Sequence, residues 1–181
     1  MMTDSRVKIA CAMALFGLVL GGVPAIGVMP LHAEIANSAQ SSKPAAPVTF
    51  FTGTTISRGS IKEMLSSDKP TRAVSVGTLQ PDGSLVIEQT VEIGDDPALN
   101  RTWRLREVGD GKVTGTISDA TSPVKGTISG NAMKLSYKLE GGLKVSQVLT
   151  IAADGKTCSN EMKIRKFGLV VARLSETITR K

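Results

Sequence analysis

The sequence has very little histidine and cysteine. Among its 181 residues there is one histidine, His32, and there are two cysteines, Cys11 and Cys158. A zinc site needs several Cys or His ligands, and a disulfide framework needs a larger, even set of cysteines. Because the chain also has no phosphate-binding glycine motif, we expect no metal, no cofactor and no catalysis of the Ser-His-Asp or Cys-His kind.

Aromatic side chains are also scarce, at 3% of residues, although the net charge is +6. Surfaces that bind single-stranded nucleic acid interleave aromatic rings with basic residues, so this composition predicts no nucleic-acid partner. The basic residues are dispersed, with small groups at Lys163–Lys166 and at Arg180–Lys181. We favour solvated strand faces for them. The alternative is a patch that is weakly attracted to an anionic membrane surface.

The first 33 residues have the layout of a secretory signal peptide. Arg6 and Lys8 precede a long uncharged apolar run, and Ala33 supplies the small residue that cleavage requires. We therefore predict a signal peptide over residues 1–33. Its removal would leave a mature protein with no histidine and a single thiol, that of Cys158.

Two readings of the N-terminal region stay open. An uncleaved inner-membrane anchor is the alternative to cleavage, but Pro24 and Pro30 disfavour it because they would interrupt a spanning helix. Residues 34–48 are small, polar and proline-containing, which predicts a flexible leader. The folded domain is then expected over residues 49–181.

Short segments of alternating apolar and polar residues dominate the rest of the chain. In Ser84–Ile93, for example, Leu85 and Ile87 share one face and Glu88 and Thr90 the other. Glycine-containing turns separate these segments, and this combination is typical of antiparallel hairpins. We predict an all-β domain that forms a single antiparallel up-and-down β-barrel. One short helix is expected over residues 60–65.

Arg101 is the charge that stands out. By alternation it shares the predicted inner face with Trp103 and Leu105, and a buried guanidinium needs a partner. We consider an ion pair between Glu88 and Arg101, which would need a β-bulge because simple parity puts Glu88 on the opposite face. The alternatives are an exposed strand end and a contact with a ligand.

Other reactive groups are few. Asp95 and Asp96 form the one adjacent acidic pair, which we interpret as a solvated turn rather than a cation site. Cys158 is expected to be a buried, unreactive thiol. An enzyme would have to use carboxylates such as Glu88 or Asp119.

Several short motifs follow one another in a fixed order over nearly the whole predicted domain. They are Phe51-x-Gly53, Gly83-x-Leu85-x-x-Glu88, Arg101-x-Trp103, Gly115-x-x-x-Asp119, Gly130-Asn131-Ala132 with Tyr137, and Asn160 with Lys166-Phe167-Gly168. In this ordered set the chain resembles a family of exported bacterial proteins and lipoproteins known as a domain of unknown function. The resemblance implies a lipocalin-like (calycin-type) β-barrel and a periplasmic location. This chain lacks the lipobox cysteine that many members carry after the signal peptide.

We therefore expect a non-catalytic periplasmic barrel that holds a small apolar or amphipathic, lipid-like molecule. The side chains expected to line its binding site are Arg101, Trp103, Leu105, Met133 and Tyr137, with Arg101 meeting an anionic headgroup. The same side chains suit a packed core equally well. The alternative function is a structural or envelope-interaction module whose barrel is filled and holds no ligand.

Overall fold

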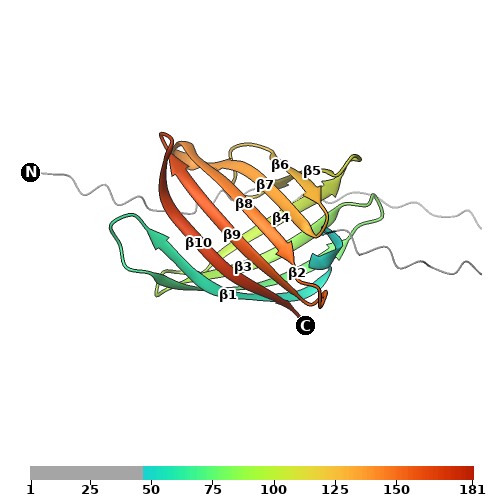
Figure 1. Cartoon of the computed structure of the whole chain (residues 1–181), viewed down its shortest axis with the longest axis horizontal. Helices are drawn as coiled ribbons and strands as arrows, with labels where there is room; N and C mark the ends of the chain where they lie inside the picture. The colour runs from blue at the N-terminus through green and yellow to red at the C-terminus, as the bar shows by residue number, and fades with distance from the viewer. Residues whose placement is uncertain (1–46) are drawn as a thin grey trace, which may run out of the picture. The chain divides into compact units, whose positions relative to one another are not determined.

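Ten antiparallel strands close into a barrel in the computed structural model, which describes residues 47–181 (Figure 1). The strands are β1 (Gly53–Glu63), β2 (Lys69–Leu79), β3 (Leu85–Ile93), β4 (Leu99–Glu107), β5 (Lys112–Ile117), β6 (Val124–Ser129), β7 (Ala132–Leu139), β8 (Leu143–Ile151), β9 (Thr157–Lys166) and β10 (Leu169–Arg180). Two short 3-10 helices, η1 (Thr49–Phe51) and η2 (Glu140–Gly142), complete the described chain. The predicted all-β, up-and-down barrel is confirmed.

Each strand pairs with its neighbours in sequence, and β1 pairs with β10 to close the barrel. The closing pair is long, running from Thr55 opposite Arg180 to Glu63 opposite Ala172. Closure leaves none of the ten described strands with an unpaired edge, which is how small all-β domains avoid edge-to-edge association.

The alternation in sequence becomes an inside and an outside. In β7, Met133, Leu135 and Tyr137 are buried in the barrel, while Lys134 and Ser136 between them are exposed. A period of two places successive side chains on opposite faces of a strand. One face of every strand therefore contributes to the interior and the other meets solvent.

Helix η1 packs at one end of the barrel (Figure 1). Its rings Phe50 and Phe51 are buried and meet edge to face, with centroids 5.1 Å apart. Gly77 on β2 makes this packing possible, because a Cβ there would lie 1.9 Å from the Phe51 carbonyl oxygen. We call this the η1 end, and the opposite end, which carries the β1–β2 and β9–β10 turns, the hairpin end.

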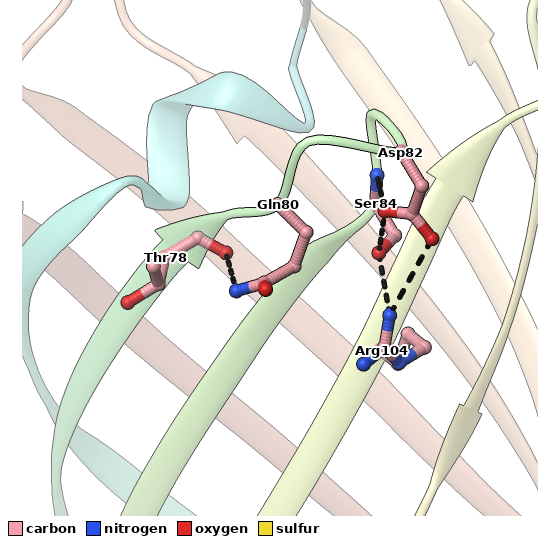
Figure 2. Close-up of polar contacts among 5 residues, drawn as sticks. All are labelled: Thr78, Gln80, Asp82, Ser84 and Arg104. Atoms are coloured by element: carbon pink, nitrogen blue, oxygen red, sulfur yellow. Dashed lines mark hydrogen bonds and ion pairs between the residues drawn. The ribbon is translucent and has the colours of Figure 1, made fainter. Parts of the chain in front are cut away.

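Polar contacts fasten the β2–β3 turn to β4 at the η1 end (Figure 2). The Asp82 carboxyl accepts bonds from the backbone N–H and the hydroxyl of Ser84, at 2.9 and 2.6 Å, and these bonds lower the pKa of Asp82. Arg104 Nη1 donates to Ser84 Oγ at 2.7 Å and lies 3.7 Å from Asp82 Oδ2. Gln80 donates to the Thr78 carbonyl at 3.3 Å. The turn is thereby held in one conformation.

The short helix expected over residues 60–65 is wrong. Residues 60–63 continue β1, and Met64 and Leu65 belong to the turn that follows. Ile61 is 3% exposed and lies between Leu174 of β10 and Lys69 of β2. The strand pairing on both sides outweighs the weak local helix preference of this segment.

The predicted signal peptide (1–33) and residues 34–46 of the predicted leader lie outside the described residues. Val48, at the end of that leader, is 5% exposed, and its carbonyl accepts a bond from the Phe51 N–H. Within residues 47–181, no helix has both the length and the apolar character needed to cross a membrane.

Candidate functional site

A hollow lies inside the barrel. The space open to the centres of water molecules is about 60 Å³, and the total empty space, counting the part continuous with bulk solvent, is about 520 Å³. Two sets of side chains line it. The polar wall consists of Thr55, Ser57, Ser75, Gln89, Gln147, Asn160 and Glu176, and the apolar wall of Ile87, Trp103, Leu105, Met133, Leu135 and Leu149. Phe51 and Ile178 complete the lining.

A carboxyl group is at the centre of the polar wall. Glu176 of β10 accepts a bond from the Thr71 hydroxyl at 3.0 Å and one from the Asn160 side-chain amide at 3.1 Å. Gly59 stands opposite Glu176 in the β1–β10 register. A Cβ on Gly59 would lie 2.8 Å from Glu176 Cγ and 1.9 Å from the Ser175 carbonyl oxygen. The missing side chain therefore makes room for Glu176 to turn inward.

A second set of bonds joins the polar wall to the apolar wall. Gln89 donates to Ser75 Oγ at 3.1 Å and accepts from the Trp103 indole N–H at 3.3 Å. Tryptophan and glutamine thus satisfy each other inside the barrel, as buried polar groups generally must. The indole ring is fixed in its orientation toward the hollow.

Three buried polar atoms of the polar wall have no protein partner among the described residues: Ser57 Oγ, Gln147 Oε1 and Asn160 Oδ1. All three belong to residues that line the hollow. An unsatisfied buried acceptor costs about 1–3 kcal/mol. These atoms form a set of oxygens that can accept hydrogen bonds from a molecule in the barrel.

The structure brings three of the five predicted lining residues to the hollow. They are Trp103, Leu105 and Met133. Tyr137 lies beside them, 4% exposed, with its ring 5.5 Å from Trp103 in an edge-to-face contact. Burial raises the pKa of the Tyr137 hydroxyl. A binding role for these residues stays a prediction.

Arg101 has a different partner from the one considered. Its Nε lies 2.9 Å from Asp119 Oδ2, and their side chains are 14% and 27% exposed. Glu88 is exposed and pairs in register with Thr102, so it points away from the barrel interior. The ion pair between Glu88 and Arg101 is therefore wrong, because β3 and β4 pair in continuous register without the bulge it required.

The same geometry separates the two carboxylates considered for an enzyme. Glu88 faces outward, and Asp119 is held by Arg101. Asp96 of the acidic pair bonds Lys69 at 2.8 Å in the β3–β4 turn. Cys158 is fully buried, and burial raises the pKa of its thiol to about 11.

The sequence argument missed Glu176. Parity carried the necessary information, since Leu174, Glu176 and Ile178 alternate with polar residues and share the inner face of β10. Gln147 was visible as a break in the alternation of β8. The structure shows that the alternation continues through Gln147, which places an amide inside the barrel at 7% exposure.

The protein is a closed antiparallel up-and-down barrel of the lipocalin-like (calycin-type) fold class. The chain belongs to the family described as "Protein of unknown function (DUF3833)", whose model matches residues 27–180. The predicted resemblance is confirmed. No curated protein sequence matches the chain.

Solved structures share this fold at low sequence identity. One is the S-type phycobiliprotein lyase CPES from Guillardia theta, with a TM-score of 0.58 and 11% identity, covering 76% of this chain and 94% of that chain. Another is Rv2717c from M. tuberculosis, with a TM-score of 0.54 and 18% identity, covering 74% of this chain and 94% of that chain. At these identities the likeness concerns the fold alone.

The lyase overturns one expectation. We expected a protein without enzymatic activity, and that expectation is wrong, because the same barrel fold occurs in a phycobiliprotein lyase. Scarcity of histidine and an all-β fold therefore do not exclude an enzyme. The likeness assigns no reaction to this chain.

Proposed function

We propose that the barrel binds one small amphipathic, lipid-like molecule in the periplasm. The apolar part of the ligand lies against the apolar wall, and a hydrogen-bond donor on the ligand meets the polar wall. The observation that carries this proposal is the set of unpartnered acceptors, Ser57 Oγ, Gln147 Oε1 and Asn160 Oδ1, which face the same hollow as Glu176. In a barrel that only filled its own core, these buried, unpartnered oxygens would lower the stability without any benefit.

The chemistry of the polar wall restricts the ligand headgroup. The free atoms are oxygens, and a carboxyl group stands among them. Arg101, which we expected to meet an anionic headgroup, is occupied by Asp119. An alcohol or an amine therefore fits this wall better than a carboxylate or a phosphate does. The periplasmic location is supported by the N-terminal sequence and is part of the proposal.

The test uses Trp103, which is the one tryptophan of the chain and lies in the hollow. Its fluorescence is titrated with 1-hexanol, hexylamine and hexanoate, which are short enough to suit a hollow with about 60 Å³ open to the centres of water molecules. We expect saturable changes with the alcohol and the amine, and about tenfold weaker binding of the carboxylate, because it lies beside the Glu176 carboxyl and, among the unpartnered atoms, can accept a hydrogen bond only from the Ser57 hydroxyl.

Asn160→Leu is expected to reduce the preference for the alcohol, while Ser159→Ala, on the outer face of the same strand, is the matched control. Native mass spectrometry of protein purified from its own periplasm gives an independent readout. Absence of both a saturable Trp103 response and a co-purified ligand would sink the proposal and favour the filled structural module.

A further inference from the structure

Four large apolar side chains are exposed on two neighbouring turns at the hairpin end. Met64 and Leu65 belong to the β1–β2 turn and are 56% and 102% exposed. Phe167 lies in the β9–β10 turn and Leu169 begins β10 directly after it, and they are 93% and 67% exposed. The turns are adjacent because β1 pairs with β10, and the Met64 N–H donates to the Val171 carbonyl at 2.8 Å. We call these four residues the apolar tips.

The backbone at the tips shows that these side chains are not ordinary turn residues. Lys166 pairs with Leu169, so Phe167 and Gly168 form a two-residue hairpin turn, with φ of 52° and 85°. A turn with positive φ at both positions favours Asn-Gly, and a bulky residue at the first position is strained. Leu65 has the same kind of conformation, with φ of 66°. The chain retains large apolar groups at two fully exposed positions that glycine or asparagine would fit better.

Basic residues surround these tips in rows across the outer face of the barrel. One row runs across β9, β10 and β1 as Lys163, Arg173 and Lys62. The next runs across β7, β8 and β9 as Lys138, Lys144 and Arg165. Lys166 stands at the tip itself, with its Nζ 5.8 Å from the centre of the Phe167 ring. We call these seven residues the basic collar.

The collar places like charges directly opposite one another. Lys138 faces Lys144, and Lys144 faces Arg165. Arg173 lies between Lys163 and Lys62 in the same way. Such cross-strand pairs destabilise a sheet. Within residues 47–181, the ion pair formed by this collar is that of Lys62 with Asp68 in the β1–β2 turn, at 2.9 Å.

This surface differs from the basic patch that the sequence offered as the alternative to solvated strand faces. Lys163–Lys166 and Arg180–Lys181 do not form one patch, because the length of β10 separates them. Arg180 is at the η1 end, where its Nη2 donates to the Thr52 carbonyl at 3.3 Å. Lys163, Arg165 and Lys166 gather instead with basic residues of β7, β8, β10 and β1, and closure of the barrel brings the distant strand β1 to this group.

We propose that the hairpin end docks on an anionic lipid bilayer. The apolar tips enter the interface between headgroups and acyl chains, and the basic collar contacts the lipid phosphates. The combination argues for a membrane, since exposed apolar tips gain from an acyl-chain region. The basic collar, in which Lys62 alone forms an ion pair within residues 47–181, gains from a negative surface. This docking surface does not depend on what the hollow binds.

The test is flotation of the full mature chain with vesicles. We expect binding to vesicles containing about one third phosphatidylglycerol, and little binding to pure phosphatidylcholine vesicles. Binding should fall in about 0.5 M NaCl, because salt screens the collar. Equal binding to neutral vesicles, or binding that ignores salt, overturns the proposal.

Variants separate docking from stability. The pair Leu65→Asn and Phe167→Asn should lower vesicle affinity about tenfold or more, while Tm stays equal or rises, because asparagine suits positive φ. Lys163→Gln with Arg173→Gln should also lower affinity, without touching the tips. Val108→Asn with Lys112→Gln removes an exposed apolar group and a charge at the η1 end and should have no effect.

Two results would contradict membrane docking at this end. The first is unchanged vesicle binding by both tip and collar variants. The second is binding of an oligonucleotide that outcompetes the vesicles and persists in the tip variants, which would assign the collar to nucleic acid instead.

Discussion

The two walls of the hollow are built from the same kind of strand but are satisfied differently. On the apolar wall, Trp103 packs edge to face on Tyr137, and its indole N–H is bonded to Gln89. On the polar wall, Gln147 and Asn160 each keep a buried oxygen without a partner among the described residues. Natural sequences generally agree with their fold in propensity, packing and hydrogen bonding, and departures from this agreement are expected mainly at functional sites. The difference separates the part of the interior that stabilises the fold from the part available for binding.

The largest effect is expected on the apolar wall. Trp103→Ala removes a side chain that is 7% exposed and its contact with Tyr137. We expect a loss of about 3–5 kcal/mol in the free energy of unfolding, because a large cavity is left in the barrel. Urea unfolding followed by circular dichroism measures it, with Val108→Ala at the exposed η1 end as control. A loss below about 1 kcal/mol would contradict the packed role of this wall.

The next largest effect tests how the polar wall is accommodated. Gly59→Ala places a methyl group against the Ser175 carbonyl oxygen and Glu176 Cγ. We expect a loss of about 2 kcal/mol, because the β1–β10 pair has to shift. Thermal unfolding gives the stability, and the Trp103 titration gives the ligand response. If Gly59→Ala leaves both unchanged, Glu176 does not need the space opposite it.

A third experiment tests whether water reaches the interior side of β9, next to the polar wall. Cys158 on β9 is fully buried, and burial raises its pKa from 9.0 to about 11. The native state therefore holds this proton where the unfolded state has lost it, and the contribution of the neutral thiol is lost as pH rises from about 9 to about 11. Stability should fall in that window by about 2 kcal/mol, and less in Cys158→Ala. Identical pH profiles would mean that water reaches the thiol.

The smallest expected change is the most discriminating. Gln147→Met keeps the volume of the side chain and removes its unpartnered oxygen. We expect a change within about 0.5 kcal/mol, or a small gain, because no protein hydrogen bond is lost. The reverse substitution on the inner face of the same strand, Leu149→Gln, should cost about 2 kcal/mol. Equal losses in both variants would erase the distinction between the two walls.

The fold was predictable because its determinants are local. Alternation over β3 and β7 assigns an inner and an outer face to each residue without knowledge of any partner. The contacts of the site were not predictable in this way. Arg101 of β4 forms an ion pair with Asp119 in the loop after β5. Glu176 of β10 accepts a hydrogen bond from Thr71 of β2. Such partners are fixed by register and closure, which a period of two does not specify.

The wrong helix has a related cause. Residues 60–65 form no helix because β2 pairs with β1 as far as Ile61 and β10 pairs with it as far as Glu63, and a local reading of this segment cannot include these partners. The basic collar was not predictable for the same reason, because long-range strand pairing brings its residues together. Lys62 and Lys163 are about a hundred residues apart in sequence, and the closing pair brings their strands to the two sides of Arg173.

The pairing of β1 with β10 also has a kinetic consequence. The other strand pairs join sequence neighbours and form as successive hairpins, whereas this one joins the first strand to the last. Loop-closure entropy makes such a long-range step slow, and β1 keeps an open edge until it occurs. Glu176 arrives on that last strand, so the polar wall is complete only when the barrel closes. A ligand that recognises this wall binds the finished barrel alone and thereby stabilises it against reopening.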